Sequence, residues 1–103
     1  MAKDDYFVIV YQVLKYLYDT LKQGYQPDPD KLTADYLGIN RYYWGYIIQS
    51  LLDEGFIKGV KIIPTKDGLV ASRFEGMQIT PKGIQYLFDN SLMEKVKDIA
   101  PLL

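Results

Sequence analysis

The chain has 103 residues, a formal net charge of −1, and neither cysteine nor histidine. Nearly half of the residues are hydrophobic, so this length fits one domain with one core. The missing residue types exclude disulfides, thiolate or histidine zinc sites and a serine–histidine nucleophile pair. We therefore expect a single domain over residues 1–103 that is not an enzyme and holds no metal or cofactor.

The first predicted helix covers residues 4–23. Its apolar side chains recur at three- and four-residue spacing. They are Tyr6, Val10, Val13, Leu14, Leu17 and Leu21. Phe7, Tyr11 and Tyr18 form a second apolar stripe, although a surface helix usually has one. We predict either that a later helix of the chain packs on the second stripe, or that the stripe forms a homodimer interface.

The beginning of the chain is too polar to cross a membrane. Lys3, Gln12 and Lys15 interrupt the apolar run, whereas a spanning helix needs about 20 consecutive apolar residues. The segment also lacks the basic start and the small-residue cleavage site of a signal peptide. We therefore expect a cytoplasmic protein that makes no membrane contact.

The second predicted helix is short. Asp28 followed by Pro29 is typical of a helix start, because proline suits the first helical position. The helix is expected to end near Leu37, where Gly38 can adopt the left-handed conformation that closes helices. Its inward side chains are predicted to be Leu32, Tyr36 and Leu37.

A third helix is predicted for residues 41–54, directly after a tight turn. Asn40 is placed to cap it and Gly55 to end it. Its apolar face consists of Trp44, Ile47, Ile48, Leu51 and Leu52. Trp44 is predicted to anchor this helix in the core rather than to serve as a stacking platform. Two helices joined in this way form a helix-turn-helix arrangement.

A β-hairpin is predicted after the third helix. The branched residues of segment 56–63 favour a strand, and segment 64–68 contains the Asp-Gly pair of a hairpin turn. A return strand is expected over residues 69–79, interrupted at Gly76.

The chain is predicted to end in one or two helices. Thr80 and Pro81 repeat the helix-start pattern, and the helix they begin is expected to bury Ile84, Leu87 and Phe88. Ser91 opens a capping box, which predicts a last helix from that residue.

This order of elements is that of an α+β, winged helix-turn-helix fold. Residues 32–57 are similar to the helix-turn-helix segment of many bacterial winged-helix regulators. Residues 79–87, ITPKGIQYL, resemble the segment after the wing in MarR-like and PadR-like families. The small size, the tyrosine-rich first helix and the ITPKG segment together resemble the YjcQ-like family, short winged-helix proteins of Gram-positive bacteria and their phages. This resemblance implies the fold and no assigned activity.

The winged-helix resemblance implies a recognition surface, because the third helix of such DNA binders enters the major groove. On this chain the groove-facing residues would be Asn40, Arg41, Tyr42, Tyr43, Gly45, Tyr46 and Gln49. The hairpin would add Lys58, Lys61, Lys66 and Arg73. Asparagine and glutamine can pair with adenine edges, arginine with guanine or phosphate, and tyrosine hydroxyls with phosphate oxygens. We therefore expect a protein that binds double-stranded DNA or is associated with transcription.

The charge of this region is weak for a DNA binder. Residues 39–75 contain five basic and four acidic residues, a net charge of +1, while the other seven basic and nine acidic residues give −2. DNA affinity depends heavily on phosphate neutralisation. A monomer would therefore bind weakly, whereas a homodimer formed through the first and last helices would double the number of cations.

The alternative to DNA binding is a protein–protein interaction module. Tyr36, Tyr42, Tyr43 and Tyr46 could form an exposed aromatic patch, and tyrosine is enriched at protein interfaces. A third possibility is that some of these tyrosines simply cover the edge of the core.

Overall fold

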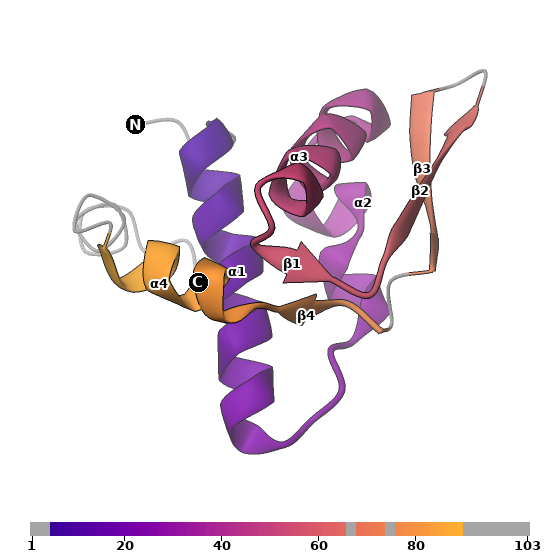
Figure 1. Ribbon diagram of the computed structural model, residues 1–103. Helices are drawn as coiled ribbons and strands as arrows, with labels where there is room; N and C mark the ends of the chain where they lie inside the picture. Colours follow the sequence, from indigo (N-terminus) through magenta and orange to yellow (C-terminus); the bar gives the residue numbers. More distant parts are fainter. Residues whose placement is uncertain (1–4, 66–67, 74–75, 90–103) are drawn as a thin grey trace.

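The computed structural model describes residues 5–65, 68–73 and 76–89 (Figure 1). In chain order the elements are α1 (Tyr6–Gln23), a 3-10 turn η1 (Pro29–Leu32), α2 (Ala34–Leu37), α3 (Arg41–Asp53), β1 (Ile57–Lys58), β2 (Lys61–Thr65), β3 (Gly68–Arg73), β4 (Gln78–Ile79) and α4 (Pro81–Asp89). This α+β order is compatible with a winged helix. The predicted last helix from Ser91 lies outside the described residues.

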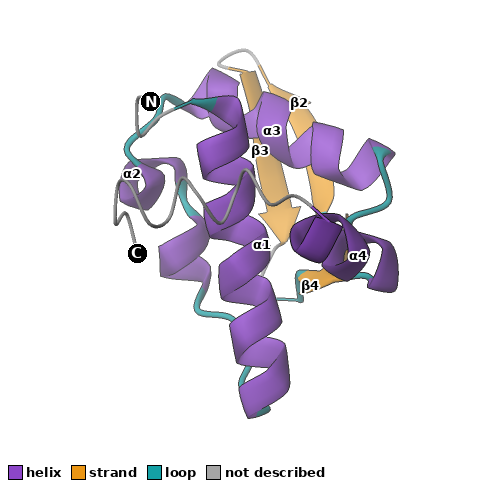
Figure 2. Ribbon diagram, turned by 90° about the vertical axis from the view of Figure 1, so that its left-hand side faces the viewer, coloured by secondary structure: helices purple, strands orange, loops and turns teal. Residues whose placement is uncertain are grey.

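Helix α1 is the central element of the core. Its middle is buried on nearly all sides, and the buried side chains are Val8, Ile9, Val10, Tyr11, Val13, Leu14 and Leu17. Leu21, predicted on the same apolar face, is instead 45% exposed. The last turn of α1 projects beyond α4 and β4 (Figures 1 and 2), and residues 21–23 at this end of the helix are exposed. Neither α1 nor another helix in the described part of the chain is long and apolar enough for a membrane span.

Helix α4 packs against α1 and covers part of its second apolar stripe. The ring of Tyr18 meets that of Phe88 edge to face, with the centroids 5.4 Å apart. This contact supports the prediction that a later helix of the chain covers the stripe. The predicted burial of Phe88 is wrong, because its ring meets Tyr18 at the surface and remains 64% exposed. Leu87 is buried as predicted, and Ile84 is partly buried.

The predicted second helix divides into η1 and α2 at Thr33. The Asp28 carboxylate accepts a hydrogen bond from the Asp30 amide at 3.0 Å, and the Thr33 hydroxyl accepts one from the Tyr36 amide at 3.1 Å. Thr33 therefore begins a new helix rather than continuing the old one, as side-chain caps often do. Leu32 is buried as predicted, but Tyr36 points outward and is 63% exposed.

The turn between α2 and α3 has the predicted geometry. Gly38 adopts a φ of 73° and closes α2, and the Asn40 side chain accepts a hydrogen bond from the Tyr43 amide at 2.7 Å. Trp44 is buried, and its indole N–H donates to the Leu32 carbonyl at 2.7 Å. This bond fixes η1 to α3. The rest of the predicted apolar face is also directed inward, with Ile47, Ile48 and Leu51 buried and Leu52 partly buried.

The predicted strand over residues 56–63 is broken at Gly59. This residue has a φ of +86°, and a Cβ atom on it would collide with the carbonyl oxygen of Gly76. The two backbone segments meet here at a distance that only glycine permits. β1 consequently pairs with β4 in one antiparallel sheet, with Ile57 opposite Ile79.

The β2–β3 hairpin forms a second antiparallel sheet and packs along α3 through β3. Its turn is shorter than predicted, because Pro64 and Thr65 belong to β2, Gly68 begins β3, and Thr65 pairs with Gly68. The predicted return strand over residues 69–79 forms two strands, β3 and β4, and the predicted interruption is confirmed, because Gly76 lies between them. Figure 1 shows the hairpin at the edge of the molecule beside α3.

Candidate functional site

The N-terminal half of α3 carries an exposed polar and aromatic surface. Asn40, Arg41, Tyr42 and Tyr46 are exposed, and we call these four residues the outer face of α3. Tyr42 is 71% and Tyr46 57% exposed, whereas Trp44 on the opposite side is buried. The helix therefore separates an outward surface from the core, as its periodicity predicts.

Three other residues that were predicted to face the DNA groove are wholly or partly buried. Gly45 is buried, so the prediction that it faces the DNA groove is wrong. A glycine has no side chain that could extend past its neighbours, and strand β3 packs along the same helix. Tyr43 is half-buried and packs against the core. Gln49 is half-buried, and its side-chain amide donates to Asp53 Oδ1 at 2.9 Å. The outer face is thus smaller than predicted.

The basic residues predicted for the wing are not all on the hairpin. Lys58 is exposed but lies on β1, which pairs with β4, so its placement on a wing strand is wrong. Lys61 and Arg73 occupy opposite positions in the register of β2 and β3. Lys66 lies outside the described residues.

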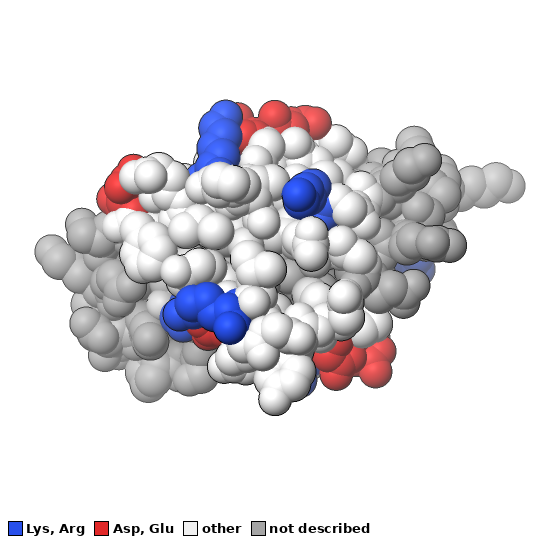
Figure 3. Space-filling view, turned by 60° about the horizontal axis from the view of Figure 1, so that its bottom comes forward, with Lys and Arg blue, Asp and Glu red and all other residues white. Residues whose placement is uncertain are grey.

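The two ends of α3 carry opposite charges. Arg41 begins the helix, and the exposed carboxylates of Asp53 and Glu54 lie at its end. Within the described part of the chain none of these three side chains forms an ion pair. On the face of the molecule shown in Figure 3, Lys and Arg side chains are separated by uncharged surface rather than joined into one patch.

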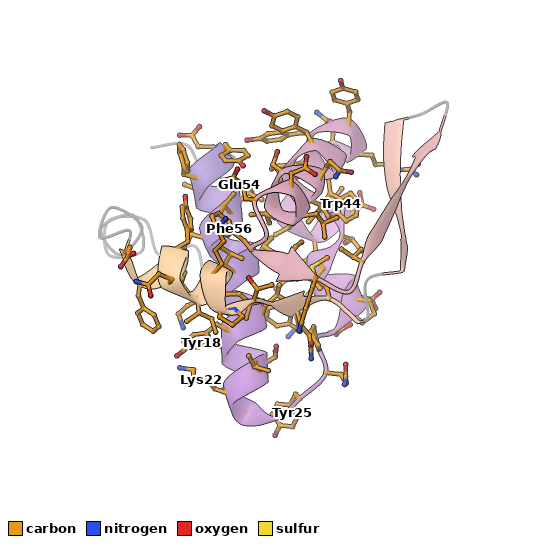
Figure 4. All side chains as sticks on the ribbon, viewed as in Figure 1. Tyr18, Lys22, Tyr25, Trp44, Glu54 and Phe56 are labelled. Carbon is orange, nitrogen blue, oxygen red and sulfur yellow. The ribbon has the colours of Figure 1, made fainter. Side chains whose placement is uncertain are left out.

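A groove of about 400 Å³ lies beside the C-terminal end of α3. No local sequence pattern predicts this groove, because its walls come from segments far apart in the chain: α1, α3, α4 and the segment after α3. Its charged and aromatic lining consists of Tyr6, Phe7, Asp53, Glu54, Phe56 and Tyr86, which we call the groove residues. Figure 4 shows Glu54 and Phe56 next to each other between α3 and α1.

Burial in this groove raises the pKa of the Tyr86 hydroxyl above its ordinary value of 10.0, and the nearby Tyr6 and Glu54 side chains raise it further.

Among the described residues, no three carboxylates gather into a group that could hold a metal ion.

Most of the chain matches a known protein family. A family model described as YjcQ protein matches residues 11–102. The chain belongs to the YjcQ family. The match spans η1, α2, α3, the hairpin and α4 as well as most of α1, which confirms the predicted YjcQ-like resemblance. No curated protein matches the chain, and no solved structure does.

Proposed function

We propose that this YjcQ-family chain is a small winged-helix protein of bacterial or phage type that binds double-stranded DNA, with α3 as its recognition helix and a role in transcription. The observation that supports this proposal is the outer face of α3. Its exposed residues occupy the helix start after a tight helix–helix turn. Recognition helices contact base edges mainly through their N-terminal residues, and the β2–β3 hairpin lies beside α3, where a wing would lie.

The chemistry of the outer face suits a nucleic acid. Asn40 uses its carbonyl oxygen to cap α3, which leaves its amide nitrogen as a donor to a base or phosphate. Arg41 offers a guanidinium group that can bind guanine or phosphate with two hydrogen bonds. Tyr42 offers a hydroxyl for a phosphate oxygen. The partial positive charge at the start of α3 adds to this attraction.

A salt series with fluorescently labelled duplex DNA tests the proposal by anisotropy. Arg41→Ala should weaken binding about tenfold, because one good arginine contact contributes roughly 1–3 kcal/mol. The slope of log affinity against log salt should also fall, by about 0.9 if the lost contact is to a phosphate.

Lys22→Ala is the matched control for this experiment. It removes the same charge from the far end of α1, where Figure 4 shows Lys22 away from α3. Its contacts, 3.9 Å to Asp19 and 4.4 Å to the ring centroid of Tyr18, involve an exposed side chain, so we expect their loss to cost no more than about 1 kcal/mol of folding free energy. If the wild-type chain binds no duplex even at low salt, or if the control substitution weakens binding as much as Arg41→Ala does, the DNA proposal is wrong.

A second candidate function is protein binding through the exposed tyrosines, without DNA. Tyr36 and Tyr42 are both more than 60% exposed, and exposed aromatic side chains commonly mark partner sites. Tyr36→Ala combined with Tyr42→Ala should then abolish capture of a protein partner while leaving the fold intact. Capture that survives this double substitution would show that this surface is not the contact.

A further inference from the structure

The groove at the end of α3 combines aromatic rings with carboxylates. Tyr6 and Phe7 come from α1, Tyr86 from α4, and Phe56 from the segment between α3 and β1. Its volume of about 400 Å³ lies within the range of small-ligand pockets, roughly 300–1,000 Å³. Among the described residues, none of the side chains that line it is basic.

The carboxylates of the groove lack a cationic partner among the described residues. Asp53 accepts one hydrogen bond from Gln49 at 2.9 Å, which leaves most of its acceptor capacity unused. Glu54 serves as the C-cap of α3 through its backbone, so its side chain is not needed for the cap. The negative end of the α3 dipole lies at the same place. Three sources of negative potential therefore coincide at one wall.

The aromatic rings are held in place by one another. Phe56 stacks on Tyr86 with centroids 4.6 Å apart and an angle of 28°, and Tyr6 meets Phe7 edge to face at 5.1 Å. Aromatic faces attract cations through their quadrupole. The Lys82 ammonium lies 5.9 Å from the Phe56 centroid, near the outer limit of such a contact, and does not line the groove.

We propose that this groove binds a guanidinium group, carried either by a free guanidine compound or by an arginine side chain of another protein. A guanidinium is planar and weakly hydrated, stacks on aromatic rings and donates parallel hydrogen bonds to carboxylates. An ammonium group is more strongly hydrated and lacks the planar fork. The site lies at the opposite end of α3 from Arg41, so it does not depend on DNA binding.

Titration of the isotope-labelled full chain, followed through its backbone amide NMR signals, tests this inference. Agmatine represents the free source and N-acetyl-arginine amide the side-chain source. N-acetyl-citrulline amide is the uncharged isostere. At least one guanidinium compound should shift the amides around Ser50, Glu54 and Phe56, and which of the two binds better identifies the source. Equal binding of the citrulline compound, or shifts confined to other parts of the chain, would overturn the proposal.

Glu54→Gln provides the test by substitution, because it removes the charge and keeps the size of the side chain. Binding of the better guanidinium compound should weaken about fivefold, as expected for losing one partly exposed charge-assisted contact. Asp35→Asn is the matched control, since Asp35 is an exposed carboxylate on α2 outside the groove. Undiminished binding by Glu54→Gln, with a melting temperature equal to wild type, would refute the site.

Phe7→Leu tests the aromatic wall separately. Phe7 is more than half exposed, so the substitution should leave the fold stable while removing one ring. Guanidinium binding should weaken severalfold, and the Arg41→Ala variant should bind the same compound as wild type does. Wild-type affinity in Phe7→Leu would show that the rings do not recognise the ligand.

Discussion

At the scale of single residues, two glycines with the same backbone conformation have different roles. Gly24 and Gly59 both have positive φ, 78° and 86°. A Cβ atom on Gly24 would meet nothing within 4 Å, whereas one on Gly59 would collide with the Gly76 backbone. Gly24 is therefore required only for its torsion angle, while Gly59 is also required for the close approach of two chain segments.

This difference predicts unequal costs for the same substitution. Gly24→Ala should lower the free energy of unfolding by about 1–2 kcal/mol, the cost of a left-handed alanine. Gly59→Ala should cost clearly more, because the β1–β4 pairing must shift to relieve the collision. Urea denaturation followed by circular dichroism measures both values. Equal losses would show that the Gly59–Gly76 approach does not stabilise the fold.

Trp44 illustrates a residue whose role was predicted only in part. Its position on the apolar face indicated burial, and it is buried. Its hydrogen bond to the Leu32 carbonyl joins segments twelve positions apart, which spacing along one helix cannot indicate. A net contribution of about 1 kcal/mol is typical of such a bond. Trp44 therefore sets the position of η1 on α3 as well as filling the core.

At the scale of elements, the start of α3 depends on one local bond. The Asn40 side chain accepts a hydrogen bond from the Tyr43 amide at 2.7 Å, and this cap fixes the residue at which the helix begins. Asn40→Ala should lower the free energy of unfolding by about 1 kcal/mol, whereas Asn40→Asp, which retains a capping oxygen, should not. Chemical denaturation of both variants measures the difference. If both are destabilised equally, the cap is not what stabilises the start of α3.

The hairpin and the groove show how packing changes the predicted site. β3 lies along α3, and Gly45 of this helix is buried, which leaves it without access to a ligand. On the other side, Tyr46 approaches Tyr6 of α1 with ring centroids 6.3 Å apart. The exposed part of α3 is thus a strip between β3 and α1, with Arg41 at one end and the groove carboxylates at the other.

At the scale of the whole molecule, homodimer formation through the first and last helices stays a prediction. The predicted last helix lies outside the described residues, but α1 and α4 leave Leu21 and Phe88 substantially exposed. We expect a dimer in sedimentation velocity, and Leu21→Gln with Phe88→Gln should shift it toward monomer. Tyr36→Gln, a control substitution on α2, should leave the dimer unchanged. A wild-type chain that stays monomeric at all concentrations would contradict this prediction.

Local sequence patterns predict the helix ends that depend on neighbouring residues alone. Gly38, Asn40 and Gly55 were identified correctly because left-handed closure and side-chain capping are local, and the inward face of α3 followed from its period. The same periodicity located most of the outer face of α3.

Contacts between distant segments, in contrast, are seen only in the folded molecule. The contact of Gly59 with Gly76 divides one predicted strand into two, and Gly45, which was predicted to face outward, is buried. The groove exists because α1, the end of α3 and α4 converge, although Tyr6 and Tyr86 are eighty positions apart in the chain. Contacts across such separations depend on how all the elements pack around one core, and no local sequence pattern predicts that packing.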